Sequence, residues 1–351
     1  MNHLVIMAGG IGSRFWPMST PQCPKQFVDV LGCGRTFIQL TVDRFKGVVP
    51  AENVWVVTSE AYRDIVAEQL PDMPKGNILL EPCRRNTAPC IAYVSWRIKL
   101  KDPKANIVVS PSDHLVLNVP EFQRVISSAL QYASETDAIV TLGMKPTRPE
   151  TGYGYIQIDD GHVEAPGIYT VKSFTEKPDA TFAQMFIDEG DFLWNAGLDF
   201  FNVNVMLSNL YRLVPEYQVE IPRMMAEAES SVPTLVPEFF SSLPNLNIDI
   251  SIMERSENVC VQEGHFGWAD MGTWASLFVD APSDAQGNVL LNTPAFLYDC
   301  QNNVIRLPNG RTAVVKGLQD YVIAEEGEIL MICPRGDVTS MRRMHIDTKF
   351  S

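Results

Sequence analysis

A glycine-rich segment near the start of the chain has the residue types that hold phosphate groups. It reads MAGGIGSRFWP over residues 7–17, and PKQ follows at residues 24–26. Glycines let backbone N–H groups point towards an anion without a clash of Cβ atoms, and Arg14 and Lys25 add cationic donors. The segment lacks the GK[ST] of a Walker A loop and the third glycine of a dinucleotide fingerprint. A simple tight turn is the alternative, and the Arg, Trp-Pro and Pro-Lys-Gln that accompany the glycines disfavour it.

Two aspartates are candidates for holding a divalent metal ion. Asp113 follows a strand-like run at 107–110, and Asp270 lies far along the chain in the run WADMGTW. Carboxylates at the edge of a sheet can hold Mg²⁺ against phosphate oxygens. The alternative for Asp113 is a turn or helix cap, and for Asp270 it is the N-cap of a helix that runs through Trp274. His114 could do acid–base chemistry, but we expect it to be a packed or exposed histidine without that role.

Strand-like and helix-like segments alternate from the start of the chain to about residue 145. The strand candidates are short, apolar and rich in β-branched residues, as expected for strands buried on both faces: 4–8, 54–58, 78–81, 107–110 and 138–142. Helix-like segments begin at Thr36, at Ser59, at Asn86 or Thr87, and near Pro120. This alternation predicts a parallel sheet with helices on both faces. Ligands of such sheets bind at the carboxyl ends of the strands.

The pattern changes twice in the rest of the chain. The middle part predicts three strands and two helices, at 153–158, 169–176 and 198–203, and at 179–189 and 205–213. After Pro282, short apolar runs separated by turn residues predict a small all-β domain: 295–298, 304–307, 313–315, 321–324 and 329–333. One or two coils of a β-helix are one form that such runs can take. We therefore expect two domains, residues 1–281 and 282–351.

Net charge and cysteine content disfavour several classes of protein. The net charge of −14 disfavours binding to nucleic acid or to an acidic membrane surface, so cations that bind a polyanion have to be concentrated locally. The seven cysteines are odd in number and form no CxxC pair, which argues against a disulfide framework and a structural zinc site. No apolar run suits a signal peptide or a membrane span. We expect a soluble, cytoplasmic protein.

The glycine-rich segment resembles the signature loop of the nucleoside-diphosphate-sugar pyrophosphorylases, and its GGxGxRxWP…PKQF form is similar to that of the mannose-1-phosphate guanylyltransferases. Further blocks occur in the family's order and extend the resemblance to about residue 280: Glu81-Pro82 with 85–89, 111–114, 151–156, Phe174 with 176–178, 194–197 and 270–274. The resemblance implies an α/β fold of the nucleotide-diphospho-sugar transferase type. Its sheet would be Rossmann-like, mixed and mostly parallel, with helices on both faces.

The resemblance also implies an activity and the residues that perform it. The family transfers GMP from GTP to mannose 1-phosphate, with Mg²⁺ as cofactor, and releases GDP-mannose and pyrophosphate. The positions that match its catalytic residues are Arg14, Lys25, Asp113, Lys177 and Asp270, of which Asp113 and Asp270 would hold the metal. Those that match its nucleotide contacts are Ala8, Gly9, Gly10, Gly12, Arg14, Lys25, Glu81, Asn86, Thr87 and Asp113. Those that match its sugar contacts are Gly154, Glu176, Lys177 and Asn195.

The residue types leave structural alternatives open at several of these positions. Glu176 and Lys177 also suit a solvated surface pair, Asn195 suits an ordinary turn, and Asn86 suits a helix N-cap. Asp199 departs from the family, which usually has an apolar residue there. Because an unpaired buried carboxylate is costly, we expect Asp199 to have a partner, to face solvent or to contact the sugar.

Two other functions stay open on the sequence. One is the same chemistry with another nucleotide or sugar 1-phosphate, such as UTP and glucose 1-phosphate. The other is a regulatory subunit that senses a sugar nucleotide without catalysis, whose mark would be the loss of Arg14, Lys25 or the two metal-site aspartates. All four residues are present. The oligomeric state is also open, with a homodimer as one alternative.

Some longer members of the family carry a phosphomannose isomerase domain, a metal-dependent cupin, after the transferase. A cupin metal site needs several histidine and carboxylate ligands that converge from different strands. Residues 282–351 contain one histidine, His345. We therefore expect no isomerase activity from this chain.

Overall fold

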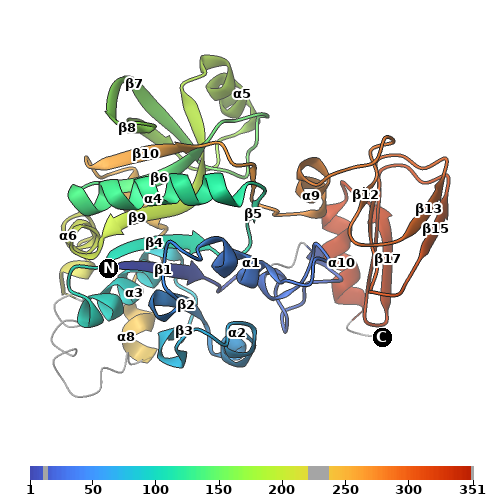
Figure 1. Cartoon of the computed structure of the whole chain (residues 1–351), viewed down its shortest axis with the longest axis horizontal. Helices are drawn as coiled ribbons and strands as arrows, with labels where there is room; N and C mark the ends of the chain where they lie inside the picture. Colours follow the sequence, from blue (N-terminus) through green and yellow to red (C-terminus); the bar gives the residue numbers. More distant parts are fainter. Residues whose placement is uncertain (11–14, 220–236, 349–351) are drawn as a thin grey trace. The chain divides into compact units, whose positions relative to one another are not determined.

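A computed structural model describes residues 1–10, 15–219 and 237–348 of the chain. The chain forms two compact units (Figure 1). The large unit comprises residues 1–9, 42–111 and 116–268, and the small unit comprises residues 10–41, 112–115 and 269–351. This division is not the same as the expected domains 1–281 and 282–351, which stay a prediction. Residues 10–41 and 269–281 group with the C-terminal strands because they pack in one core with them.

A mixed nine-stranded sheet forms the large unit. Its order is β3-β2-β1-β4-β9-β6-β10-β8-β7. The strands are β1 (Asn2–Met7), β2 (Val54–Ser59), β3 (Ile78–Glu81), β4 (Asn106–Pro111), β6 (Ile139–Met144), β7 (Tyr155–Ala165), β8 (Ile168–Thr175), β9 (Phe192–Asn202) and β10 (Val259–Gly264). The predicted strands of the first 145 residues agree with this assignment to within two residues at either end.

The direction of two strands departs from the expected parallel sheet. Strands β1 to β4 pair in parallel, as predicted. Every pairing that β8 or β9 makes is antiparallel, and β9 lies between β4 and β6. The expectation of a mostly parallel sheet is therefore wrong for the half that contains β8 and β9. The strands on either side of β9 come from distant parts of the chain, and no local pattern encodes that insertion.

Helices cover both faces of the sheet. On one face, Val5 and Ile107 pack in a single core with α3 (Thr87–Lys101) and α6 (Val203–Leu213). Alternate strand residues point to the other face, where α4 (Val119–Glu135) packs against β4, β6, β9 and β10. Figure 1 shows α4 lying across these strands. The prediction of helices on both faces is confirmed for the described part of the chain.

Helix ends follow local signals in the sequence. Asn118 accepts a hydrogen bond from the backbone of Glu121 at the start of α4, with a proline in the first turn. Asp179 caps α5 (Ala180–Glu189), which ends at Gly190 in the left-handed region with φ +82°. Glycine adopts that conformation without strain. Shorter helical elements are α1 (Phe37–Arg44), η3 (Ala51–Asn53), η4 (Glu60–Tyr62), α2 (Arg63–Gln69), η5 (Lys75–Asn77), α8 (Pro237–Ser242) and the π-helical turn η6 (Asp249–Met253).

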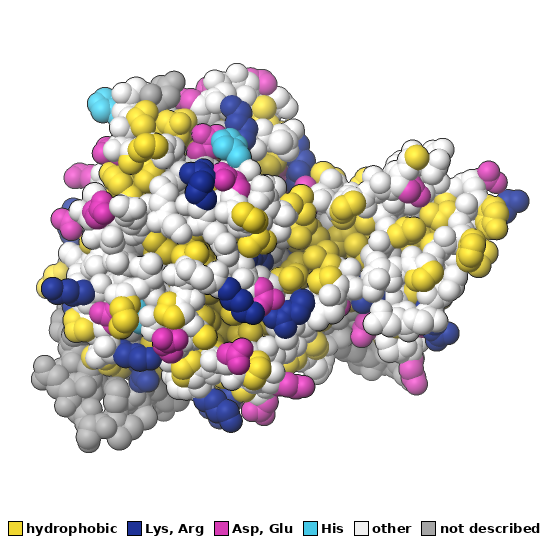
Figure 2. Space-filling view, viewed as in Figure 1, with side chains coloured by type: hydrophobic (Ala, Val, Ile, Leu, Met, Phe, Trp, Pro, Cys, Tyr) yellow, Lys and Arg dark blue, Asp and Glu magenta, His cyan; other side chains and the backbone are white. Residues whose placement is uncertain are grey.

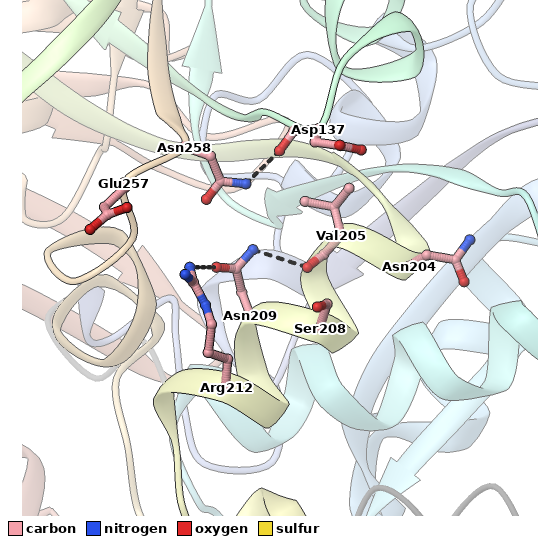
Figure 3. Close-up of a pocket in the computed structure, with 8 residues that line it drawn as sticks. All are labelled: Asp137, Asn204, Val205, Ser208, Asn209, Arg212, Glu257 and Asn258. Carbon is pink, nitrogen blue, oxygen red and sulfur yellow. Dashed lines mark hydrogen bonds between the residues drawn. The ribbon is translucent and has the colours of Figure 1, made fainter.

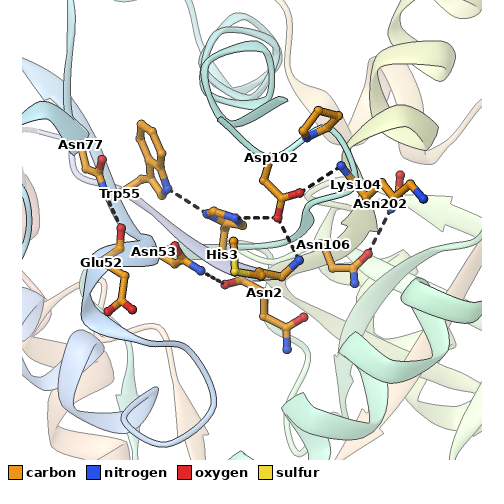
Figure 4. Close-up of polar contacts among 12 residues, drawn as sticks. Asn2, His3, Glu52, Asn53, Trp55, Asn77, Asp102, Lys104, Asn106 and Asn202 are labelled. Carbon is orange, nitrogen blue, oxygen red and sulfur yellow. Dashed lines mark hydrogen bonds and ion pairs between the residues drawn. The ribbon is translucent and has the colours of Figure 1, made fainter. Parts of the chain in front are cut away.

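Polar side chains join the beginnings of β1, β2 and β4 (Figure 4). Trp55 Nε1 donates to His3 Nδ1 over 3.2 Å, so the hydrogen of the neutral ring sits on Nε2, which lies 3.3 Å from Asp102 Oδ2. Burial lowers the pKa of His3 and favours that neutral form. Asn53 Nδ2 donates to the Asn2 carbonyl over 3.1 Å. These contacts hold the amino ends of parallel strands, the edge opposite to the one where ligands of such sheets bind.

The strands of the small unit alternate between two sheets along the chain. One sheet contains β12 (Val289–Leu290), β14 (Val304–Arg306) and β16 (Tyr321–Glu326) in parallel, and the other contains β13 (Ala295–Tyr298) and β15 (Ala313–Lys316) in parallel. A chain that visits two parallel sheets in turn makes successive coils, the arrangement of a short β-helix. β17 (Ile329–Pro334) then pairs antiparallel with β16. Other elements are η2 (Lys25–Phe27), β5 (Leu115–Val116), β11 (Trp268–Ala269), α9 (Trp274–Asp280) and α10 (Val338–Asp347).

Two buried asparagines connect neighbouring coils. Asn303 Nδ2 donates to Asn288 Oδ1 over 3.0 Å and to the Leu318 carbonyl over 2.9 Å. Satisfied amides of this kind hold turns in register, because a buried polar group without a partner is costly. Strands β13, β15 and β17 carry exposed apolar side chains: Phe296, Tyr298, Val314, Leu330 and Ile332. Figure 2 shows apolar side chains gathered over the C-terminal strands. None of the described helices is both long and apolar enough to cross a bilayer.

Candidate active site

In the small unit, three chain segments meet at the buried ammonium group of Lys25. The Lys25 residue is 2% exposed. Its Nζ lies 2.8 Å from Asp113 Oδ2, 2.7 Å from the Met271 carbonyl and 3.3 Å from the Asp270 carbonyl. An ammonium group has three donors, so each has an acceptor within hydrogen-bond distance. Lys25 therefore brings the two predicted metal-site residues to one place.

Aromatic rings flank the same ammonium group. Lys25 Nζ lies 5.4 Å from the ring centre of Phe15 and 5.5 Å from that of Phe37, within the range of cation–π attraction. Phe15 in turn packs against Trp274, with ring centres 5.0 Å apart. Lys25 was expected to contact phosphate, and its burial was not predicted. Lysine is rarely fully buried, and nothing local to the PKQ run indicates its partners.

Gln26 connects the same turn to the glycine-rich loop. Its side-chain Nε2 donates to the Gly10 carbonyl over 2.9 Å. Among the described residues, no atom lies within 4 Å of the position that a Cβ would take at Gly10. Gly12 and Arg14, which the resemblance places against phosphate, lie outside the described residues.

Neighbouring contacts exclude the N-cap alternative for Asp270 and give Asp113 a charged partner. Helix α9 is capped by Thr273, whose side chain accepts a backbone hydrogen bond at the first turn, so Asp270 is not its N-cap. The Asp113 carboxylate makes the ion pair described above. His114 is buried, with Nε2 3.9 Å from Asp270 Oδ1. It is a packed histidine, as expected.

Asp113 and Asp270 fit one mode of magnesium binding. Their side chains are 27% and 33% exposed, so both carboxylates are accessible. Within the described residues there is no cluster of three or more His, Cys, Asp or Glu side chains that could hold a metal ion. Magnesium in enzymes that act on phosphates is usually held by one or two carboxylates together with water and substrate phosphates. The two aspartates suit that kind of site rather than one made of protein ligands alone.

In the large unit, Glu176, Lys177 and Gly154 lie together. Lys177 Nζ is 2.6 Å from Glu176 Oε1, and the exposed fractions of the two side chains are 59% and 15%. A Cβ on Gly154 would lie 2.7 Å from Glu176 Oε2, closer than Cβ atoms normally approach. Glycine at 154 therefore makes room for the carboxylate. The pair itself and the exposed Lys177 agree with the alternative of a surface pair, which therefore stays open, although the Glu176 side chain is only 15% exposed.

Asn195 lies inside β9, and its amide is held from three sides. Oδ1 accepts from the Gly197 backbone N–H over 3.0 Å and lies 3.2 Å from Thr141 Oγ1. Nδ2 donates to Asp249 Oδ1 over 3.2 Å. Gly197 has φ +67°, a left-handed conformation in the middle of the strand that suits glycine. The predicted strand began only at residue 198, whereas β9 already includes Asn195. The alternative of an ordinary turn asparagine is therefore wrong.

Asp199 is buried beside this amide. It is 3% exposed, and its Oδ1 lies 2.9 Å from Thr141 Oγ1. Burial and the neighbouring Asp249 carboxyl raise the pKa of Asp199 to about 8. Burial, and to a smaller extent the negative charge of Glu176, raises the pKa of Asp249. Of the outcomes expected for Asp199, a partner is the one found. Sequence analysis missed Asp249, which stands in a segment without a motif and reaches the amide only through the fold.

The three residues expected to contact the base, Glu81, Asn86 and Thr87, differ in the hydrogen bonds that their side chains make. The Asn86 side chain accepts from the Thr87 backbone at the start of α3, so its N-cap alternative is confirmed. Thr87 Oγ1 accepts from the Ile248 backbone over 2.8 Å. Glu81 Oε1 is buried without a hydrogen-bond partner among the described residues, and burial raises the pKa of Glu81 to about 7. Its Oε2 lies 3.5 Å from the Cβ position of Gly9, the residue that, with Ala8, follows β1.

A polar pocket of the large unit is lined by none of the predicted site residues (Figure 3). It is lined by Asp137, Asn204, Val205, Ser208, Asn209, Arg212, Glu257 and Asn258. Arg212 Nη2 donates to Asn209 Oδ1 over 3.0 Å, and Asn209 Nδ2 donates to the Val205 carbonyl over 3.0 Å. Its central polar groups thus bind one another, and Asp137 and Asn258 precede the starts of β6 and β10. The pocket is at the edge of the sheet where parallel-sheet ligands do not usually bind.

Comparison with known proteins gives a consistent result. A family described as nucleotidyl transferase matches residues 3–287. A mannose-1-phosphate guanylyltransferase of Escherichia coli is 33% identical over 98% of this chain and 75% of its own length, and one of Klebsiella pneumoniae is 34% identical over 94% and 70%. A crystal structure described as mannose-1-phosphate geranyltransferase from Thermus thermophilus is 27% identical with a TM-score of 0.88, covering 99% of both chains.

Proposed function

Because the chain belongs to the nucleotidyl transferase family, we propose that it transfers GMP from GTP to mannose 1-phosphate and releases GDP-mannose and pyrophosphate. The observation that carries the proposal is the meeting of Lys25, Asp113 and the Asp270–Met271 backbone. Charge of both signs, held in place before substrate arrives, is what phosphoryl-group chemistry requires. The names of the curated relatives support the choice of sugar phosphate and nucleotide. We place the enzyme in the cytoplasm.

The reaction needs no side-chain nucleophile or general base. A phosphate oxygen of mannose 1-phosphate is already ionised at neutral pH. It attacks the α-phosphorus of GTP, the bond from that phosphorus to the β-phosphate oxygen breaks, and pyrophosphate leaves. Rate enhancement then comes from positioning and from neutralisation of charge. The chain contains neither a GxSxG nucleophile elbow nor an HExxH metal motif.

Each group of residues has one task in this proposal. Arg14 neutralises the nucleotide phosphates. Lys25, whose three donors already have acceptors, adds its positive charge without direct contact and holds Asp113 in place. Mg²⁺, when bound by Asp113 and Asp270, would neutralise charge on the phosphate oxygens of both substrates. Lys177 holds the attacking phosphate. These cations provide the local positive charge that a protein of net charge −14 needs to bind two polyanions.

The sugar and the base have separate contacts in the proposal. Glu176 binds sugar hydroxyls through its carboxylate. Asn195 binds a sugar hydroxyl through the amide hydrogen that is not donated to Asp249. Glu81 binds the base. Its buried Oε1 lacks a partner among the described residues, and a carboxylate acceptor suits the adjacent N–H donors of guanine. Asn86 and Thr87 take part through the position of the α3 start, since their side chains already bind backbone groups.

Pyrophosphate release tests the reaction. The purified chain is expected to release pyrophosphate from GTP and mannose 1-phosphate, and to require a divalent cation. A panel of four nucleoside triphosphates against several sugar 1-phosphates, with and without chelator, measures the choice of substrates. Faster turnover of another pair would change the proposed substrates but not the proposed type of reaction. No pyrophosphate from any pair would overturn the enzyme proposal and favour the sensing subunit.

A methyl group at residue 154 is expected to weaken sugar binding. In Gly154→Ala the new Cβ would lie 2.7 Å from Glu176 Oε2, so the carboxylate has to move. We expect the KM for mannose 1-phosphate to rise roughly tenfold, the scale of the ~1–3 kcal/mol that overpacking costs, with the KM for GTP nearly unchanged. Gly76→Ala is the matched control, because no atom of the described residues lies within 4 Å of its Cβ position. Equal effects on both KM values would contradict the sugar role of Glu176.

A further inference from the structure

We propose that Asp199 is a positioning residue of the sugar site, which in its protonated form completes a hydrogen-bond chain through Thr141 and so holds the Asn195 amide in place. The inference rests on the proposed function, because it takes Asn195 as a sugar contact. Asp199 is one position where the chain departs from the family it resembles. Its role therefore has to come from its own contacts.

A single hydroxyl hydrogen is shared among several acceptors next to Asp199. Thr141 Oγ1 lies 2.9 Å from Asp199 Oδ1, 3.2 Å from Asn195 Oδ1 and 3.4 Å from the Leu198 carbonyl. A threonine hydroxyl donates once. If Asp199 is ionised, the hydrogen goes to the carboxylate in a charge-assisted bond, and Asn195 Oδ1 then faces a lone pair. If Asp199 is protonated, its O–H donates to Thr141, and Thr141 donates to Asn195.

The contacts of Asn195 fix the direction in which these hydrogen bonds run. Asn195 Oδ1 accepts from the Gly197 backbone N–H, and Nδ2 donates to Asp249 Oδ1. The amide cannot turn over without losing both bonds. Hydrogen bonds therefore run from Asp199 to Thr141, from Thr141 to Asn195 and from Asn195 to Asp249, and each of these bonds has one donor and one acceptor. That complete chain exists only when Asp199 carries a proton.

The surroundings of Asp199 favour the neutral acid. The residues opposite Asp199 in β4 and β6 are uncharged. The charged group that acts on Asp199 is the Asp249 carboxyl on η6, and Glu176 and Lys177, which follow β8, act in turn on Asp249. The single cation among them is paired with Glu176 at 2.6 Å. An ionised Asp199 would be a buried carboxylate beside another carboxyl, which is costly.

The first test separates sugar binding from nucleotide binding across pH. In the wild-type protein, the KM for mannose 1-phosphate is expected to rise roughly two- to tenfold, the scale of one hydrogen bond, as the pH passes through about 8. The KM for GTP is the internal reference. Asp199→Asn keeps a donor towards Thr141 at every pH and is expected to abolish the rise. Asp199→Leu has no donor, so its sugar KM is expected to be high at every pH.

The second test reads the proton on Asp199 without any substrate. An unfolded aspartate has a pKa near ~3.9, so between that pH and about 8 the folded wild type binds one proton more than the unfolded chain. Its free energy of unfolding therefore falls as the pH rises through this window. Asp199→Asn lacks that contribution. Chemical denaturation of both proteins across the window is expected to show the wild type losing stability relative to the variant.

The outcomes of the two tests are distinguishable. A falling relative stability together with a pH-dependent sugar KM supports the inference. Equal pH profiles of the sugar KM in the wild type and Asp199→Asn overturn it, even if the enzyme is active on the proposed substrates. A falling relative stability in a protein that turns over no substrate pair overturns the sugar role together with the proposed function. Equal stability profiles overturn the protonated form of Asp199 itself.

Discussion

Asp113→Asn is expected to abolish turnover, with a loss of roughly a thousandfold or more in kcat, because charge neutralisation by a bound metal contributes several kcal/mol to such reactions. Asparagine keeps the size of the side chain and one acceptor for Lys25, so the fold is expected to persist. The lost negative charge lies 2.8 Å from a buried ammonium, and a modest fall in melting temperature is therefore expected too. Initial rates of pyrophosphate release, measured over a magnesium titration, give the result.

Asp320→Asn is the matched control for this change. Asp320 also belongs to the small unit and pairs with Arg335 at 3.2 Å, but its side chain is 51% exposed. Its φ of +62° suits asparagine as well as aspartate. This control is expected to keep wild-type rates and the wild-type magnesium dependence. Normal turnover by Asp113→Asn would show that Asp113 serves the structure of the small unit and that the metal assignment is wrong.

Lys25→Ala is expected to cost about 2–4 kcal/mol of transition-state stabilisation, the scale for removing one preorganised group that stabilises charge. The loss should appear in kcat/KM measured by pyrophosphate release. Two effects contribute in the structure: the positive charge disappears, and the carbonyls of Asp270 and Met271 lose the donor that holds them. Met271 has φ +53°, so this segment depends on its contacts to keep an uncommon backbone conformation.

Lys25→Met separates charge from packing. Methionine restores apolar volume between the rings of Phe15 and Phe37 but carries no charge and no donor. If charge and positioning matter most, Lys25→Met is expected to lose nearly as much activity as Lys25→Ala while unfolding at a higher temperature. A loss below tenfold in both variants would mean that Lys25 only packs.

The sequence by itself determined the local elements and the family. Strands β1 to β4 are short apolar runs between turn residues, and caps such as Asn118 and Asp179 mark where helices begin. These signals act over a few residues, where backbone preference and burial leave little choice. The family was also identified from the sequence, through the ordered blocks from the glycine-rich loop to residues 270–274. Each block is a short run of residue types that can be recognised without knowing its contacts.

The tertiary structure alone decided what those residues touch. The insertion of β9 between β4 and β6 brings Asn195 to Thr141 and Asp199, and η6 adds Asp249, which no motif had indicated. Lys25 became a buried partner of Asp113 and Met271 rather than an exposed cation. The physical reason is common to both cases. Burial, and the hydrogen-bond partners that a buried polar group must find, depend on chain segments that pack from far away, and a local run of residue types carries no information about them.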